Sequence, residues 1–174
     1  MQIEVSGIFR LLTKPDKGFY FDSNTKFFKA QDSQTIMKLN SNDRYRVEDI
    51  LNTYGNSVSA IQLNWVDYKL TSGNSVFTMS ENKISGNVTI DYLFISLPDP
   101  AFCPIVLTQI NCQNNTVATY QRAATRCQSF NGCAKKGVCP LSVVKCPNGY
   151  NLASVPSKPN GCPRYYCDPS FLSN

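Results

Sequence analysis

Eight cysteines are the residues of this chain whose types and spacing could do chemistry. The numbers of residues between successive cysteines are 8, 14, 5, 5, 6, 15 and 4, in the order Cys103, Cys112, Cys127, Cys133, Cys139, Cys146, Cys162 and Cys167. A structural zinc site takes paired ligands from a knuckle with about two to four intervening residues, often together with histidine. The chain has no histidine and no Cys-x-x-Cys, and only Cys162 and Cys167 fit the loose end of that spacing.

The same cysteines match a disulfide framework better. Their number is even, and the segment that holds them is rich in turn-forming glycine and proline. Each bridge in such a module stabilises it by roughly 2–4 kcal/mol, mainly by constraining the unfolded chain. We therefore predict four disulfides, no metal and no cofactor, with a zinc site as the alternative. The connectivity stays open, since eight cysteines allow about 105 pairings.

Catalytic chemistry has little support in the sequence. Without histidine, the usual general base for a serine or cysteine nucleophile is missing. Glu48 and Asp49 are neighbours on an expected helix, and Asp67 and Asp91 fall at polar positions of expected strands. A carboxylate pair drawn from distant strands is the one catalytic arrangement left open. We expect the protein not to be an enzyme.

Charge divides the chain near residue 100. The first hundred residues hold ten basic and eleven acidic side chains, whereas residues 101–174 hold seven basic side chains and one acid, Asp168. Such a basic module could meet an acidic glycan or an acidic protein surface, although scattered solubilising charges would look the same. The two adjacent lysines are too few for a nucleic-acid patch. The candidate contacts are Arg122, Arg126, Lys135, Lys136, Lys145, Lys158 and Arg164.

The first hundred residues read mainly as β structure. Short apolar runs alternate with polar residues and are separated by turn-like sequences such as Asp22-Ser23-Asn24. The patterns predict strands over Val76–Met79 and Val88–Phe94, the second continuing to Leu97 before Pro98-Asp99-Pro100 ends it. Ala60–Leu70 also reads as a strand, with a change of phase after Trp65 that suggests a bulge.

One segment has helical periodicity. Val47, Ile50, Leu51 and Tyr54 follow the i, i+3, i+4, i+7 spacing, with Asp43 as a candidate N-cap and Gly55 as the C-terminal glycine. We expect one short amphipathic helix here.

The fold class that follows is mainly β, with two parts. Residues 1–100 are expected to form an antiparallel sandwich or jelly-roll-like domain with one short helix. Residues 101–174 are expected to form a small, disulfide-rich, loop-dominated basic module. A hairpin of 105–110 with 116–120 would continue the sheet to about residue 120, and no periodicity follows Cys127.

Two further motifs bear on function. The order Cys146-Pro147-Asn148-Gly149-Tyr150, then Gly161-Cys162 and Cys167, resembles half of an antistasin-type inhibitor repeat, without the closing Cys-x-Cys of that pattern. Turn glycines beside disulfides would explain the same residues. In an inhibitor, residues 151–160 would be the presented loop. Asn87 and Asn114 begin candidate glycosylation sequons.

The expected setting is a virion or the extracellular space. Disulfides need an oxidising environment, no apolar run is long enough to span a membrane, and no signal peptide is visible in Met1–Phe9. We expect a non-enzymatic structural or assembly protein, such as a capsid, coat or matrix component that docks onto other proteins through the stapled basic module. A secreted binding module, lectin-like or protease-inhibitor-like, is the first alternative, and a cytosolic zinc-binding interaction protein is the second.

Overall fold

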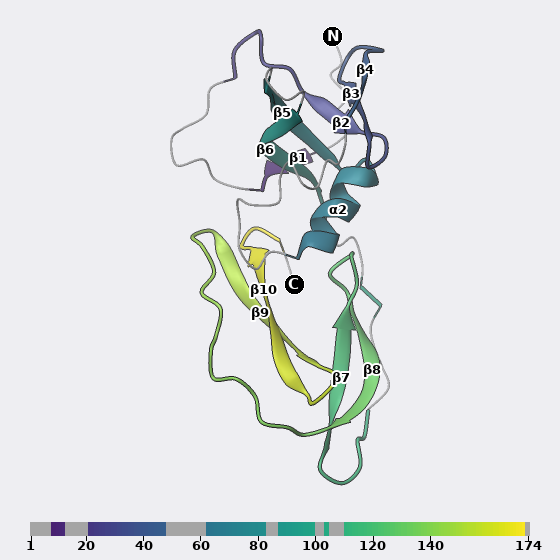
Figure 1. Cartoon of the computed structure of the whole chain (residues 1–174), viewed down its shortest axis with the longest axis vertical. Coiled ribbons are helices and arrows are strands. Elements are labelled where there is room, and N and C mark those ends of the chain that lie inside the picture. The colour runs from purple at the N-terminus through teal and green to yellow at the C-terminus, as the bar shows by residue number, and fades with distance from the viewer. Residues whose placement is uncertain are drawn as a thin grey trace. The chain divides into compact units, whose positions relative to one another are not determined.

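The structure is a computed structural model of the whole chain, and it describes residues 8–12, 21–47, 62–82, 87–99, 103–104 and 110–172. The chain divides into two compact units. Unit 1 contains residues 1–57 and 66–98, and unit 2 contains residues 58–65 and 99–174. Their elements are labelled in Figure 1.

Six strands of unit 1 form one antiparallel sheet. They are β1 (Ile8–Leu11), β2 (Phe28–Ala30), β3 (Thr35–Lys38), β4 (Arg44–Arg46), β5 (Ser75–Asn82) and β6 (Asn87–Leu97), in the spatial order β1-β6-β5-β2-β3-β4. The mainly β, antiparallel prediction is confirmed, and β5 and β6 lie where the alternation placed them. The sandwich or jelly-roll form stays a prediction.

A bulge in β6 changes which residues face the core. Thr78 pairs with Tyr92 but Met79 pairs with Ile90, so Asp91 is the extra residue. Ile90 is therefore buried on one side of the bulge, and Leu93 and Ile95 on the other. A regular alternation from Val88 to Phe94 would keep one face throughout, but the bulge reverses side-chain parity within the strand.

The segment expected to form the Ala60–Leu70 strand is instead the helix α2 (Leu63–Thr71). Its buried residues are spaced i, i+3, i+4, i+7 and i+8, at Gln62, Trp65, Val66, Lys69 and Leu70. The change of phase after Trp65 came from this helical period and not from a bulge. Trp65 is almost completely buried, with 1% of its surface exposed.

The predicted helix around Val47–Tyr54 does not begin at Asp43. Residues Arg44–Arg46 are the edge strand β4, which pairs with β3 through Ile36 and Tyr45. The backbone is therefore extended where a first helical turn was expected. Residues 48–55 lie outside the described residues.

Unit 2 is built from two antiparallel hairpins. The first joins β7 (Thr116–Arg122) to β8 (Gln128–Lys135), and the second joins β9 (Tyr150–Ser157) to β10 (Cys162–Pro169). β7 therefore pairs with β8 and not with residues 105–110, of which only Ile110 is described. No periodicity marked β8, β9 or β10, because strands of two-stranded hairpins expose much of both faces.

All eight cysteines of unit 2 are paired in four disulfides, which confirms the disulfide-rich module. The pairs are Cys103–Cys127, Cys112–Cys133, Cys139–Cys162 and Cys146–Cys167, with Cα–Cα distances of 5.3, 5.8, 5.3 and 5.5 Å. These distances lie inside the range that disulfide geometry requires. Since every sulfur is bonded, no thiolate is left to hold zinc.

The disulfides divide unit 2 into two halves with the same plan. In each half two cysteines precede a hairpin, and they are bonded in crossed order to two cysteines at or near the hairpin's second strand. Sequence separations of 24 and 21 in the first half match 23 and 21 in the second. β7 of the first half contacts β9 of the second. Unit 2 is thus a tandem pair of two-disulfide hairpins.

Candidate interaction site

The segment that links the two hairpins, residues 137–147, is held at both ends by disulfides and is called the braced loop here. Cys139 is bonded to Cys162 at the start of β10, and Cys146 is bonded to Cys167 near its end. In Figure 1 the loop runs without secondary structure from β8 to β9. The loop expected at residues 151–160 is wrong for most of its length, because residues through Ser157 belong to β9.

Apolar side chains of the braced loop point into solvent. The exposed fraction is 95% for Val138, 98% for Leu141 and 58% for Val143, and Val144 is also exposed. Isolated exposed apolar residues are normal on a protein surface, but several in one short loop are less usual, and they make this loop the candidate interaction site. Since this loop is tied at both ends, it cannot collapse freely to bury them.

The backbone of the braced loop is also largely unpaired. Gly137 N–H donates to Asn160 O at 3.1 Å at the start of the loop, and Pro147 O accepts from Tyr150 N–H at 3.1 Å at its end. Residues 138–146 are all described, and they make no backbone–backbone hydrogen bond with another described residue. A backbone segment without such bonds is a candidate for pairing with an extended segment of a partner.

Four exposed lysines accompany the loop. Lys135 and Lys136 precede it directly, and Lys145 lies within it. Lys158 belongs to the β9–β10 turn, beside Gly132 of β8. The single acid of residues 101–174, Asp168, is 5% exposed and adds almost no negative charge to this surface. The loop thus joins apolar side chains to positive charge.

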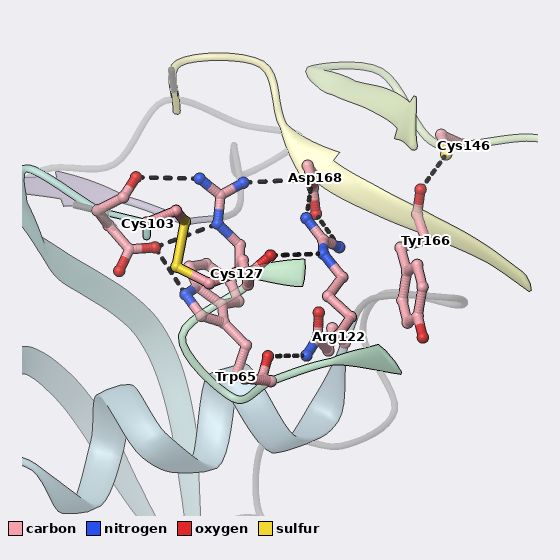
Figure 2. A network of polar contacts seen from close by, with 11 residues as sticks. Trp65, Cys103, Arg122, Cys127, Cys146, Tyr166 and Asp168 are labelled. Carbon is pink, nitrogen blue, oxygen red and sulfur yellow. Dashed lines mark hydrogen bonds and ion pairs between the residues drawn. A yellow bond between two sulfur atoms is a disulfide. The ribbon is translucent and has the colours of Figure 1, made fainter. Parts of the chain in front are cut away.

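Two of the candidate anion contacts are buried in ion pairs within unit 2. Arg122 donates from Nη1 to Asp168 Oδ1 at 2.9 Å and from Nη2 to Asp168 Oδ2, a bidentate pair. Arg126 Nη1 lies 3.2 Å from the same Asp168 Oδ2. Figure 2 shows Arg122 and Asp168 facing each other. These two arginines neutralise the buried Asp168 carboxylate, and their guanidinium groups are not exposed to solvent.

The network extends to Trp65 and Asp99. Trp65 Nε1 donates to Asp99 Oδ2 at 2.7 Å, and Arg126 Nε lies 3.3 Å from that oxygen. Arg126 Nη2 also donates to Asp99 O at 3.0 Å, and its guanidinium lies 5.8 Å from the Trp65 ring centre. Two arginines and two aspartates therefore balance in charge where water is excluded, which fits a structural role.

The other candidate residues are placed as follows. Asn114 is exposed in a two-residue turn before β7, and Asn87 lies in β6 opposite Asn82. Glycosylation of either residue stays a prediction. Burial raises the pKa of the Tyr150 phenol to about 12, so this tyrosine is neutral at physiological pH.

In the described part of the chain, no three acidic or sulfur-bearing side chains gather to hold a metal ion. None of the helices in that part has the length and apolar content to span a membrane.

The braced loop was not predicted from the sequence. The sequence nevertheless contains a signal for this loop. One apolar residue precedes Cys139 and three lie between Cys139 and Cys146, without the spacing of a strand or a helix; they are Val138, Leu141, Val143 and Val144. Apolar residues in an unpatterned segment between two cysteines cannot all reach a core. The tandem repetition of the two halves, though not the pairing within them, was also visible as similar cysteine intervals.

One similar protein was found among curated proteins, an uncharacterized protein of Dictyostelium discoideum. The two sequences are 32% identical over 166 residues, which cover 92% of this chain. The chain spans 57% of that relative's length. No protein-family model and no solved structure matches the chain.

Proposed function

We propose that this protein is a non-enzymatic component of an extracellular coat or matrix, and that it docks onto a neighbouring protein through the braced loop. One observation carries the proposal. The loop presents unpaired backbone and apolar side chains while two disulfides, Cys139–Cys162 and Cys146–Cys167, limit its freedom. A preorganised loop loses little conformational entropy when it binds.

Charge and chemical setting support the same proposal. The lysines beside the loop favour a partner with an acidic surface. Four disulfides are typical of an oxidising compartment. A coat or matrix is preferred to a virion shell because the related protein is encoded by a cellular organism.

The test compares retention of loop variants in the extracellular fraction of cells that produce the protein. The double substitution Leu141→Ser and Val143→Ser should release the protein into the soluble fraction. Ile8→Ser, which alters a side chain 65% exposed in β1, is the matched control and should stay retained. Because all three side chains are exposed, the melting temperature should not change. Equal retention of the loop variant and the wild type would refute docking through this loop.

Peptidase inhibition is a second candidate function, favoured by the exposed segment around Leu141, which has no secondary structure of its own. A peptidase cleft binds its substrate as an extended chain, and Leu141 would suit an apolar specificity pocket. Inhibition assays with a chymotrypsin-type peptidase and with Leu141→Lys test this candidate. Tight inhibition that Leu141→Lys abolishes would favour it over assembly.

A further inference from the structure

A second site lies within unit 2, away from the braced loop. The start of α2, the end of β7 and the middle of β10 enclose an open hollow of about 470 Å³. Polar and aromatic side chains line most of it, namely Gln62, Asn64, Arg122, Arg164, Tyr165 and Tyr166. The volume falls within the range of small-molecule sites.

Positive charge in this hollow comes from Arg164. The Arg122 guanidinium is engaged by the Asp168 carboxylate, whereas Arg164 is exposed and lies over the Tyr166 ring, 5.7 Å from its centre. Among the residues that the structure describes, no acidic side chain lines the hollow. The first turn of α2 adds the positive end of a helix dipole, because its first N–H groups lack partners within the helix. The hollow therefore favours an anionic group.

Gln62 adds a different requirement. Its Nε2 donates to Ala123 O at 2.6 Å. This hydrogen bond identifies which terminal atom of the amide is the nitrogen, so the other terminal atom is the oxygen, Oε1. The side chain is 5% exposed, and Oε1 is buried without a hydrogen-bond partner. An anion cannot pair with this oxygen, since both are acceptors. A hydroxyl group can donate a hydrogen bond to this oxygen. The hollow therefore fits a ligand that carries both an anionic group and hydroxyl groups.

We propose that this hollow binds an acidic saccharide, with a uronic acid residue as the recognised unit. The sugar carboxylate pairs with the Arg164 guanidinium, and sugar hydroxyls pair with Gln62 Oε1 and the Asn64 amide, which both donates and accepts. The Tyr165 ring offers an apolar face to the sugar's C–H groups. This proposal is independent of the function of the braced loop.

The test is titration calorimetry of the full oxidised chain with a glucuronate-containing disaccharide. A neutral glucose disaccharide and inorganic sulfate are the comparison ligands. The glucuronate disaccharide should bind more tightly than both, because only it supplies the anion and the hydroxyls together. Arg164→Gln should weaken its binding about 10- to 100-fold, the effect of losing one charge-assisted hydrogen bond. Asn64→Ala should weaken it less.

Lys26→Gln is the matched control, since it removes the same charge from an exposed residue outside the hollow. It should leave the affinity unchanged. Equal weakening by Lys26→Gln and Arg164→Gln would overturn the site in favour of diffuse charge attraction. Sulfate binding as tight as that of the glucuronate disaccharide would overturn the saccharide class. No binding of the glucuronate disaccharide, with an unchanged melting temperature for the protein, would overturn the proposal altogether.

Discussion

At the scale of single residues, the feature that organises unit 2 is the sharing of Asp168 by two buried arginines. Arg122 and Arg126 have side chains only 5% and 3% exposed, and Asp168 contacts both guanidinium groups. Taking charges out of water costs several kcal/mol per ion unless geometry and hydrogen bonds are nearly complete. The pairs here include a bidentate contact and a hydrogen bond from Arg122 Nε to Arg126 O at 3.1 Å.

Asp168→Asn is expected to destabilise unit 2 strongly. The substitution keeps the side-chain shape but leaves two buried positive charges facing a neutral amide, so the loss should be about 3–5 kcal/mol. Urea unfolding followed by far-ultraviolet circular dichroism would measure it. Asp43→Asn alters an exposed acid and serves as the control. A loss below about 1 kcal/mol for Asp168→Asn would contradict the role assigned to the network.

Tyr150 gives a prediction for alkaline pH. Burial raises its pKa to about 12 from the ordinary value of 10.0, so the unfolded chain releases this proton before the folded chain does. The contribution of Tyr150 to stability is therefore complete below pH 10 and is lost as the pH rises through 12. Titration of the near-ultraviolet phenolate band should include a late phase near pH 12 from Tyr150, and Tyr150→Phe should remove that phase. A titration curve that Tyr150→Phe leaves unchanged would contradict the assignment.

At the scale of elements, the close packing of the two hairpins depends on Gly161 in the β9–β10 turn. Gly161 has φ +73°, and a Cβ there would overlap Cγ2 of Val117 on β7. Valine is β-branched and has little freedom to rotate away. The second hairpin can therefore approach β7 only because this position has no side chain.

Gly161→Ala should destabilise the protein more than Gly149→Ala does. Gly149 also has positive φ, at +87°, but a Cβ there would meet nothing within 4 Å. Both variants incur backbone strain, and only Gly161→Ala adds overpacking, so the difference should be about 1–3 kcal/mol. Thermal unfolding of the two variants measures that difference. Adding Val117→Ala to Gly161→Ala should recover part of it, and failure to do so would place the strain elsewhere.

The elements also show where sequence patterns succeed. β5 and β6 were predicted because both strands lie in the interior of a sheet and carry apolar residues at nearly regular positions. α2 was mistaken for a strand because Leu63 and Tyr68, which complete the alternation, are exposed residues on the outer face of the helix. Exposed apolar residues therefore imitated a period of two.

At the scale of the whole molecule, the two units are held together internally by different interactions. Unit 1 contains no cysteine, and its described core is apolar, with Phe28, Ile36, Phe77, Leu93 and Ile95 almost completely buried. Unit 2 contains all four disulfides and a smaller apolar core that includes Val155 and Tyr166. Small modules with so little core depend on disulfides.

Reduction should therefore unfold unit 2 and leave unit 1 folded. Hydrogen exchange followed by mass spectrometry, with and without a reductant, would measure this unit by unit. Amides of β7 to β10 should lose protection after reduction, whereas those of β5 and β6 should keep it. The oxidised protein carried through the same steps is the control. Simultaneous loss of protection in β5 and β6 would show that the two units unfold cooperatively.

The sequence by itself determined that this protein is mainly β and rich in disulfides, because these properties follow from composition, cysteine spacing and local alternation. An even number of cysteines without histidine predicts disulfides, and alternation over Val76–Leu97 predicts paired strands. Only the tertiary structure decided which cysteines pair, which charges are buried and which apolar residues stay exposed. Those outcomes depend on contacts between residues far apart in the chain, such as Arg122 with Asp168. No local pattern encodes such contacts.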